Sequence, residues 1–318
     1  MSSSLRRCAS SLAAAATAVL AVAACGQSAD TGAGAAGTER GTLVFAAVPS
    51  EQSTTLQQDY AAVIAMLEKE TGMKIEFQNA TAYAAVIEGM RAGQIDIAQY
   101  GPFSYVLAKN QSAGITPVAA AVEEMGGEPG YQSYGITAAG SDITDLAGFA
   151  GRKVCFVDPN STSGYLYPTA GLIEAGVDPV NGLTPTFAGG HDASALAVAS
   201  GQCDAGFAYD EIVDVKLIET GQLQNGQLRT VWKSETIAGS PMAVSGDLDP
   251  QIRQKIAEAL AQKANVDYLA ANGFCPSVED CKVGEEGGWG YVPVDDRFYD
   301  GVRKVCDVTK AESCTSLG

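Results

Sequence analysis

Residues 154–176 read VCFVDPNSTSGYLYPTAGLIEAG, and this stretch predicts a buried strand, a polar turn and a helix. The apolar residues 154–157 predict the strand, and the hydroxyl-rich residues 158–164 predict the turn. The helix that follows ends at Gly176, because glycine commonly terminates helices. A strand joined to a helix in this way is the repeating unit of a mainly parallel α/β sheet.

The same alternation extends to both sides of this stretch and predicts an α/β fold. Apolar runs predict strands at residues 43–48, 75–77, 95–98, 184–187, 204–209, 228–232 and 242–245. Helical spacing of apolar residues predicts helices at residues 60–71, 83–92, 192–200, 211–220 and 250–265. The pattern therefore forms two similar units, the second inserted in the first.

Two such units predict two lobes joined by two crossing strands. We expect one lobe to comprise residues 42–137 and 241–318, and the other residues 138–240. The crossings are expected near residues 134–138 and 240–244. A ligand would then bind between the lobes, at the carboxyl ends of the strands.

The first residues predict export from the cytoplasm. Arg6 and Arg7 precede an apolar stretch at residues 12–22, which is too short to span a membrane and is typical of a secretory signal. The sequence Val22-Ala23-Ala24-Cys25 resembles the bacterial lipobox, which implies a signal peptide at residues 1–24 and a lipid anchor on Cys25. The alternative is an ordinary secretory signal with a cysteine at this place by chance. Residues 25–41 have the composition of a flexible tether.

The charge of the chain excludes one class of partner. The formal net charge of the 318 residues is −17, which argues against nucleic acid. It does not argue against a small anion, because donors in a cleft outweigh a distant and screened net charge. No second apolar run reaches the length of about 18 residues that a spanning helix needs.

Cysteine usage also fits an exported protein. Besides Cys8 in the leader and the predicted lipidation site Cys25, six cysteines remain, and an even number predicts disulfides. Proximity in the chain favours Cys275–Cys281 and Cys306–Cys314, which leaves Cys155–Cys203 to join two strands of one lobe. Zinc binding is the rival interpretation, but no Cys-x-x-Cys pair occurs and His191 is the only histidine. We therefore expect no metal and no cofactor.

Three consecutive hydroxyl residues open the helix of the first stretch, namely Ser161, Thr162 and Ser163. Their O–H groups and the unpaired N–H groups of the first helical turn can converge on one point, toward which the positive end of the helix dipole also points. A tetrahedral oxyanion needs such a set of donors. The alternative is that one of these residues only caps the helix.

Further candidate donors lie where other predicted strands end. His191 follows two glycines between a strand and a helix, so the backbone there can approach a ligand closely. Tyr83 and Tyr100 follow strands in the same way, and their phenols could donate to an anion. Each of these residues could instead have a purely structural role.

Together these residues resemble the phosphate/phosphite/phosphonate-binding proteins of ABC importers, a group that includes the PhnD proteins. The resemblance covers about residues 42–260 and extends more loosely to residue 305. The matching segments are AYA (82–84), DIAQYGP (96–102), PGY (129–131), DPNSTSG (158–164), GHD (190–192), ALAV (195–198) and VWKS (231–234). The resemblance implies a two-lobe, type II periplasmic-binding-protein clamp with two crossing strands as its hinge. It also implies an ABC importer permease as partner, and an oxyanion held by Ser161, Thr162, Ser163, Tyr83, Tyr100 and His191.

The same resemblance addresses the substituent of the ligand. In relatives that bind aminoalkyl phosphonates, acidic side chains at the far end of the pocket bind the ammonium group. Glu211 aligns with one of these positions, and Ser240 stands where another has aspartate. This departure favours phosphite or a ligand with a small or uncharged substituent. A carboxylate such as Glu211 would also reject ionised sulfate but tolerate a protonated oxyanion. Alternatively, Glu211 is a solvated residue at a helix start.

Other functions are less well supported by the sequence. An enzyme would need a nucleophile with a base, a metal cluster or a nucleotide-binding loop, and no such motif occurs. The same clamp could instead bind a sulfonate, sulfate or another small organic anion. A sensor subunit would use the same clamp, so the sequence does not separate sensing from transport. We expect a monomer that is anchored to the cell membrane outside the cytoplasm.

Overall fold

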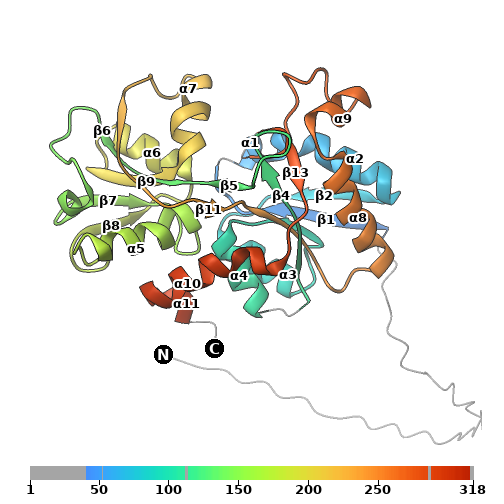
Figure 1. Ribbon diagram of the computed structural model, residues 1–318, viewed down its shortest axis with the longest axis horizontal. Helices are drawn as coiled ribbons and strands as arrows, with labels where there is room; N and C mark the ends of the chain where they lie inside the picture. The colour runs from blue at the N-terminus through green and yellow to red at the C-terminus, as the bar shows by residue number, and fades with distance from the viewer. Residues whose placement is uncertain (1–40, 52, 112–113, 286–287, 316–318) are drawn as a thin grey trace, which may run out of the picture. The chain divides into compact units, whose positions relative to one another are not determined.

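Two β-sheets joined by a short ribbon organise the chain. The structure is a computed structural model that describes residues 41–51, 53–111, 114–285 and 288–315. The predicted signal peptide, Cys25 and nearly all of the predicted tether lie outside the described residues. Figure 1 shows the two sheets and the ribbon between them.

The first sheet has the strand order β13-β4-β12-β3-β1-β2. β1 runs parallel to β2 and β3, whereas β12 is antiparallel to both of its neighbours, β3 and β4. The strands are β1 (Thr42–Ala47), β2 (Lys74–Gln78), β3 (Ile97–Gln99), β4 (Thr116–Val122), β12 (Pro241–Val244) and β13 (Gly290–Val292).

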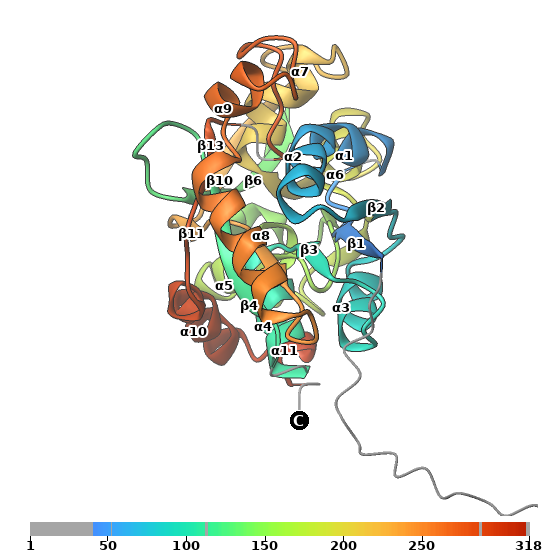
Figure 2. The same cartoon turned by 90° about the vertical axis from the view of Figure 1, so that its right-hand side faces the viewer.

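Helices from both ends of the chain accompany this sheet. Figure 2 shows α8 lying along it beside α2, and these two helices contact each other. Gly72 ends α2 with a φ of 71°, a left-handed conformation that glycine adopts without strain. The helices are α1 (Ser53–Asp59), α2 (Ala61–Thr71), α3 (Tyr83–Arg91), α4 (Pro102–Gln111), α8 (Pro250–Lys263), α9 (Val266–Ala271), η4 (Asp296–Tyr299), α10 (Asp300–Thr309) and α11 (Glu312–Thr315).

The second sheet has the order β10-β6-β9-β7-β8. β7 runs parallel to β8 and β9, whereas β6 is antiparallel to β9 and β10. The strands are β6 (Ser133–Ala138), β7 (Lys153–Phe156), β8 (Thr184–Phe187), β9 (Ala205–Tyr209) and β10 (Leu228–Lys233). The helices are η1 (Leu146–Phe149), η2 (Thr162–Leu166), α5 (Tyr167–Glu174), α6 (His191–Ala199), η3 (Ile212–Lys216) and α7 (Leu217–Glu219).

The connecting ribbon consists of β5 (Gly130–Tyr131) and β11 (Ile237–Ala238), which pair antiparallel. This corrects the expected crossings, because residues 134–138 belong to β6 of the second sheet and residues 241–244 form β12 of the first. The crossings therefore precede the expected places by a few residues. The sheets are also mixed rather than mainly parallel, because the strands next to the ribbon, β6 and β12, run antiparallel to their neighbours.

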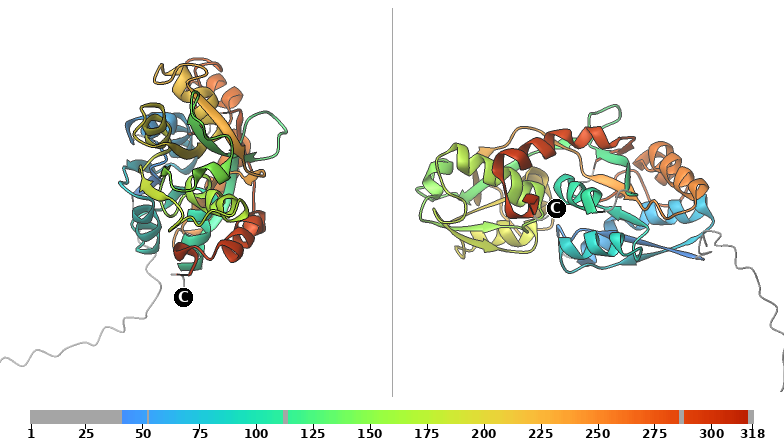
Figure 3. Two further views of the ribbon diagram at one scale, coloured as in Figure 1. Left: turned by 90° about the vertical axis from the view of Figure 1, so that its left-hand side faces the viewer. Right: turned by 90° about the horizontal axis from the view of Figure 1, so that it is seen from below.

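Apolar side chains from the two sides of the ribbon share one core cluster. Val157, Leu166 and Tyr167 of the second-sheet side pack in the same cluster as Phe103 and Ile237. Helix α10 contacts both α4 and α5 and so bridges the two sides, as the right-hand view of Figure 3 shows. This packing brings the carboxyl end of β7 next to the amino end of α4.

The six described cysteines form three disulfides, in the pairing that the sequence favoured. They are Cys155–Cys203, Cys275–Cys281 and Cys306–Cys314. Cys155 lies in β7, and Cys203 lies just before β9 rather than within it. Among the described residues, no helix has the length and apolar character needed to cross a membrane.

Candidate functional site

The turn after β7 opens a helix with its hydroxyl residues facing inward. Ser161 caps the helix, because its Oγ accepts a hydrogen bond of 3.1 Å from the Gly164 N–H. The first turn, η2, is a π-turn and α5 follows without a break; such turns occur often at functional sites. A Cβ on Gly164 would lie 2.4 Å from the Cβ of Val157. Only glycine therefore lets the turn pack this closely on the strand end.

His191 begins α6 and presents a hydrogen-bond donor to Ser161. Its Nδ1 accepts a hydrogen bond of 3.1 Å from the backbone N–H of Tyr209. Burial lowers the pKa of His191 to about 3, so the ring is neutral at physiological pH. Because Nδ1 is the acceptor, the ring proton sits on Nε2, which lies 3.4 Å from the Ser161 Oγ. The tautomer thus supplies an N–H donor beside the helix start.

Tyr83 supplies a further donor from the first-sheet side. It is the first residue of α3 and is 2% exposed. Burial, with a smaller contribution from the negative charge of Glu285, raises its pKa well above the ordinary value. The phenol therefore keeps its proton, and it interacts with the Ser161 side chain.

These donors line one small cavity, which we call the donor cavity. Its volume is about 10 Å³, close to the room that one buried water molecule needs. The cavity brings together six of the eight side chains that the sequence assigned to ligand binding. The lining residues are Val48, Tyr83, Gly101, Tyr131, Ser161, Thr162, Ser163, His191, Tyr209, Ser240 and Glu285.

Hydrogen bonds join the two sides of the structure around the donor cavity. The Phe103 N–H donates to the Thr162 Oγ1 at 2.8 Å, and the His191 N–H donates to the Ser50 carbonyl at 2.7 Å. Because Thr162 accepts with its oxygen, its hydroxyl hydrogen stays available as a donor. The two sides are therefore closed on each other at this point.

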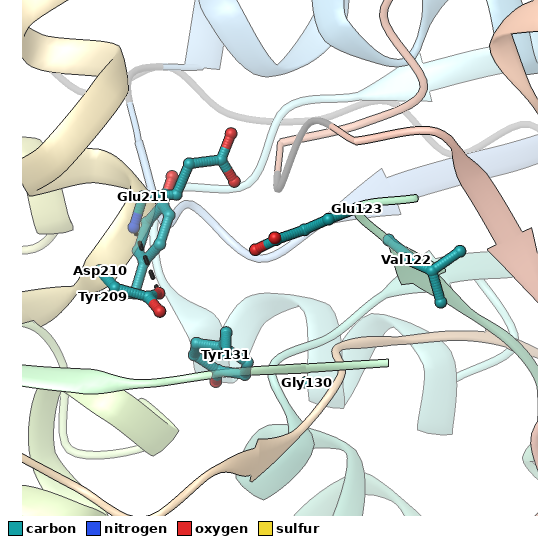
Figure 4. Close-up of a pocket in the computed structure, with 8 residues that line it drawn as sticks. Val122, Glu123, Gly130, Tyr131, Tyr209, Asp210 and Glu211 are labelled. Carbon is teal, nitrogen blue, oxygen red and sulfur yellow. Dashed lines mark hydrogen bonds between the residues drawn. The ribbon is translucent and has the colours of Figure 1, made fainter. Parts of the chain in front are cut away.

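Tyr100 and Glu211 do not reach the donor cavity. Tyr100 is fully buried, and its phenol donates to the Val86 carbonyl at 3.4 Å. Glu211 lines a neighbouring cavity, which we call the acidic cavity and which Figure 4 shows. The side chains of Glu123 and Glu211 approach it from opposite sides, and Asp210 lies beside them. Burial raises the pKa of Asp210.

Comparison with known proteins assigns this arrangement to a family. The profile described as "ABC transporter, phosphonate, periplasmic substrate-binding protein" matches residues 45–274. The chain belongs to this family.

Three relatives support the assignment. The "Phosphate-import protein PhnD" of Mycolicibacterium smegmatis is 52% identical over 86% of this chain and 87% of its own. The "Phosphonates-binding periplasmic protein" of Escherichia coli K12 is 30% identical over 78% of this chain and 70% of its own. The crystal structure of a binding protein component of an ABC phosphonate transporter from Pseudomonas aeruginosa aligns with a TM-score of 0.74 at 25% identity, over 87% of this chain and 89% of its own.

Membership of this periplasmic substrate-binding family confirms the predicted two-lobe clamp of the type II periplasmic binding proteins. Family members are substrate-binding components of importers, so the chain is a binding protein rather than an enzyme. The periplasmic family also fits the expected location outside the cytoplasm. Within the described part of the chain, no group of three or more His, Cys, Asp or Glu side chains could hold a metal ion.

The sequence analysis did not select three polar side chains of the donor cavity, namely Tyr131, Tyr209 and Glu285. Tyr209 ends β9 and Tyr131 lies in the family segment PGY, so both carried a signal that could have been used. Glu285 carried none, because it lies far from any predicted strand end. It lies beyond the residues that the family profile matches.

Proposed function

We propose that this periplasmic substrate-binding protein captures a small phosphorus oxyanion in the donor cavity. One observation carries the proposal: the His191 N–H, the hydroxyls of residues 161–163 and the Tyr83 phenol converge on one buried cavity. These groups come from three different helix starts. Tetrahedral oxyanions need donors from several directions, and a helix start adds a favourable dipole.

The number of donors suffices without a cationic side chain in the cavity. A micromolar complex requires about 8 kcal/mol. A hydrogen bond to a charged group contributes about 1.5–3 kcal/mol, so five or six of them reach this range after the cost of immobilising the ligand. The formal charge of −17 is therefore compatible with binding an anion.

Phosphate, phosphite and small phosphonates fit the donor cavity better than aminoalkyl phosphonates. Because a volume of about 10 Å³ holds only about one water molecule, the two sides must open for any oxyanion, and they must open further for a long substituent. At position 240 the cavity wall carries a neutral hydroxyl side chain, so Glu285 is the single carboxylate that lines the cavity. The relative that is 52% identical is named a phosphate-import protein, which supports phosphate itself as a ligand.

Capture would proceed by closure of the two lobes. We propose that the ribbon of β5 and β11 is the hinge, which moves the expected boundaries at 137/138 and 240/241 to residues 130–131 and 237–238. The ligand would bind to one lobe first. Closure then adds the bonds from Phe103 to Thr162 and from His191 to Ser50, and the permease recognises the closed form.

A lipid on Cys25 would keep the clamp at the cell membrane as a monomer. The lipobox-like segment ending at Cys25 supports this part of the proposal. If it is correct, Cys25→Ala releases the protein from the membrane fraction into the soluble fraction. Retention of the variant in the membrane would contradict the anchor.

Thermal unfolding of the purified chain tests the proposed ligand class. A ligand at 100 times its dissociation constant adds about 2.7 kcal/mol to the free energy of unfolding. We expect this with phosphate, phosphite or methylphosphonate, and a smaller effect with 2-aminoethylphosphonate. Stabilisation by sulfate or a sulfonate alone would instead support the alternative, the same clamp carrying a sulfur oxyanion. Transport and sensing use the same closed form, so ligand uptake must be measured to separate them. Loss of uptake in cells that lack the permease would indicate transport, and unchanged uptake would indicate sensing.

A further inference from the structure

A single carboxylate, Glu285, lines the donor cavity together with the oxyanion donors. It is 7% exposed and lies in the segment between the Cys275–Cys281 disulfide and β13. Gly284 precedes it with a φ of 148°, and a Cβ there would lie 2.7 Å from the Tyr291 phenol oxygen and 2.8 Å from Tyr60 Cε1. Glycine at this position therefore lets the segment press against two tyrosines and direct Glu285 inward.

Contacts from the first-sheet side hold Glu285 in place. Its Oε2 accepts a hydrogen bond from the Ser50 hydroxyl, and its backbone N–H donates to the Tyr60 phenol oxygen at 3.4 Å. Glu285 shares the cavity wall with Tyr83 and Tyr209. Burial raises the pKa of both phenols, and the negative charge of Glu285 adds to this effect. Glu285 is thus a built part of the cavity wall and not a surface side chain.

An ionised carboxylate can only accept hydrogen bonds. The hydroxyl and N–H groups of the cavity can donate to an oxyanion, whereas the carboxylate cannot. A bare anionic oxygen next to it would be repelled, whereas a P–OH group could donate to it. We infer that Glu285 is a specificity-determining residue that requires a protonated oxygen on the bound oxyanion, and so favours hydrogen phosphate over sulfate. This inference rests on the proposed function and adds a selection rule to it.

The rule separates ligands by the protons they keep. A phosphate monoester loses its second proton with a pKa of about 6. An alkyl phosphonate also has two acidic protons, and it loses the second and last of them as the solution becomes alkaline. Inorganic phosphate keeps one P–OH as its dianion, and sulfate carries none at neutral pH. With Glu285 in the cavity wall, we therefore expect the protein to bind phosphate at pH 8.5. It should bind methylphosphonate less tightly as the pH rises, and it should reject sulfate at every pH.

The groups that face Glu285 do not change their protonation state between pH 6 and 8.5. The pH dependence of ligand binding should therefore come mainly from the ligand itself. Burial lowers the pKa of His191 to about 3 and raises the pKa values of Tyr83 and Tyr209, so these groups stay neutral. Burial also works to lower the pKa of Lys216, but Glu51 and Asp59 outweigh it and raise the pKa, so Lys216 stays charged. Tyr60 also faces Glu285, and its phenol oxygen accepts a hydrogen bond from the Glu285 backbone N–H.

Binding calorimetry with phosphate, methylphosphonate and sulfate at pH 6.0, 7.0 and 8.5 tests the inference on the purified chain and on Glu285→Gln. In the unmodified chain we expect methylphosphonate affinity to fall at least tenfold between pH 6.0 and 8.5, while phosphate affinity changes less than threefold. In Glu285→Gln the amide can donate, so the fall with methylphosphonate should disappear and sulfate affinity should rise at least tenfold. Glu211→Gln is the matched control, because Glu211 lines the acidic cavity, and it should keep the unmodified pH profile.

The outcomes separate this inference from the proposed function. Binding of phosphate and methylphosphonate with the same pH profile in the unmodified chain and in Glu285→Gln would overturn the role of Glu285 and leave the proposed function standing. Binding of none of the phosphorus oxyanions would overturn the proposed function itself. If Glu285→Gln unfolds, Ser50→Ala replaces it. Removing the Ser50 hydrogen bond frees the carboxylate to move and should weaken the discrimination against sulfate, and unchanged discrimination would contradict the inference.

Discussion

The donor cavity and the acidic cavity are neighbours with opposite chemistry. Both are lined by Tyr131 and Tyr209, yet one gathers neutral donors around the single carboxylate of Glu285, and the other gathers the carboxyl groups of Glu123, Asp210 and Glu211. The donors are buried, whereas the acidic residues are exposed or half-buried. The difference teaches that position near a strand end does not decide what a cavity binds. The local hydrogen-bond geometry decides it, above all how many helix starts face inward for each carboxylate.

The largest predicted effect concerns the donor cavity and its buried His191. We expect this histidine to lower the free energy of unfolding in acid. The unfolded histidine binds a proton below its ordinary pKa of about 6.5, whereas the folded ring does so only near 3. The unfolded state therefore binds more protons between these values, and stability falls as the pH falls. The expected contribution is about 1.4 kcal/mol per pH unit in this window, and none above it.

Urea unfolding of the purified chain and of His191→Asn at pH 4.5 and 7.5 measures this contribution. The asparagine cannot titrate, and its side-chain oxygen can still accept the Tyr209 N–H. We expect the unmodified chain to lose about 2–3 kcal/mol more than the variant on going to pH 4.5. An equal loss in both proteins would mean that the folded histidine titrates near its ordinary pKa.

The next effect is on ligand affinity and concerns Thr162. Its Oγ1 accepts the hydrogen bond from Phe103 across the two sides, and its hydroxyl hydrogen remains for the ligand. Thr162→Val keeps the shape but removes both bonds. We expect the dissociation constant for phosphate to rise by about 10- to 150-fold, which corresponds to about 1.5–3 kcal/mol.

A matched control for this change is Thr137→Val in β6. Thr137 is equally buried, and its Oγ1 has no hydrogen-bond partner among the described residues. Calorimetry should find the phosphate affinity of this variant unchanged. If both variants weaken binding alike, the loss reflects general packing and not a bond to the ligand.

A smaller effect is expected on stability when the helix cap is removed. The Ser161 Oγ accepts the Gly164 N–H, so Ser161→Ala should lower the free energy of unfolding by about 1 kcal/mol without ligand. Asp249→Ala removes the cap of α8, which accepts from the N–H groups of Gln251 and Ile252. Asp249→Ala should lower the free energy of unfolding by a similar amount and leave the phosphate affinity unchanged. Ser161→Ala should lower both the free energy of unfolding and the phosphate affinity. If Ser161→Ala keeps its affinity, Ser161 is only a cap.

The sequence predicted the parts of the site that are encoded locally. A strand end, a run of hydroxyl residues and a helix start lie within residues 154–176, so periodicity and capping rules placed residues 161–163. The same pattern predicted His191, which follows β8 and begins α6. The two similar α/β units also predicted two sheets. Each unit has its own strands, and its helices cover them as a second layer.

The remaining features depend on contacts between distant residues. Glu285 is held by Ser50, which is 235 residues away, and no local pattern reports such a contact. The crossings were placed a few residues late because the ribbon strands have only two residues each and give no periodic signal. Tyr100 looked like a donor from its place after β3, but its ring turns into the core and its hydroxyl bonds to Val86.

The smallest predicted effect tests the boundary between the two cavities directly. Glu211 lines only the acidic cavity and is half-buried, so water screens its charge from an anion in the donor cavity. Two unit charges about 8 Å apart in a watery medium interact by about 0.5 kcal/mol. Glu211→Gln should therefore tighten phosphate binding by about twofold in calorimetry at low salt, and by less at high salt. A change of tenfold or more would mean that the ligand touches both cavities, and the two would then form one binding site with an acidic end.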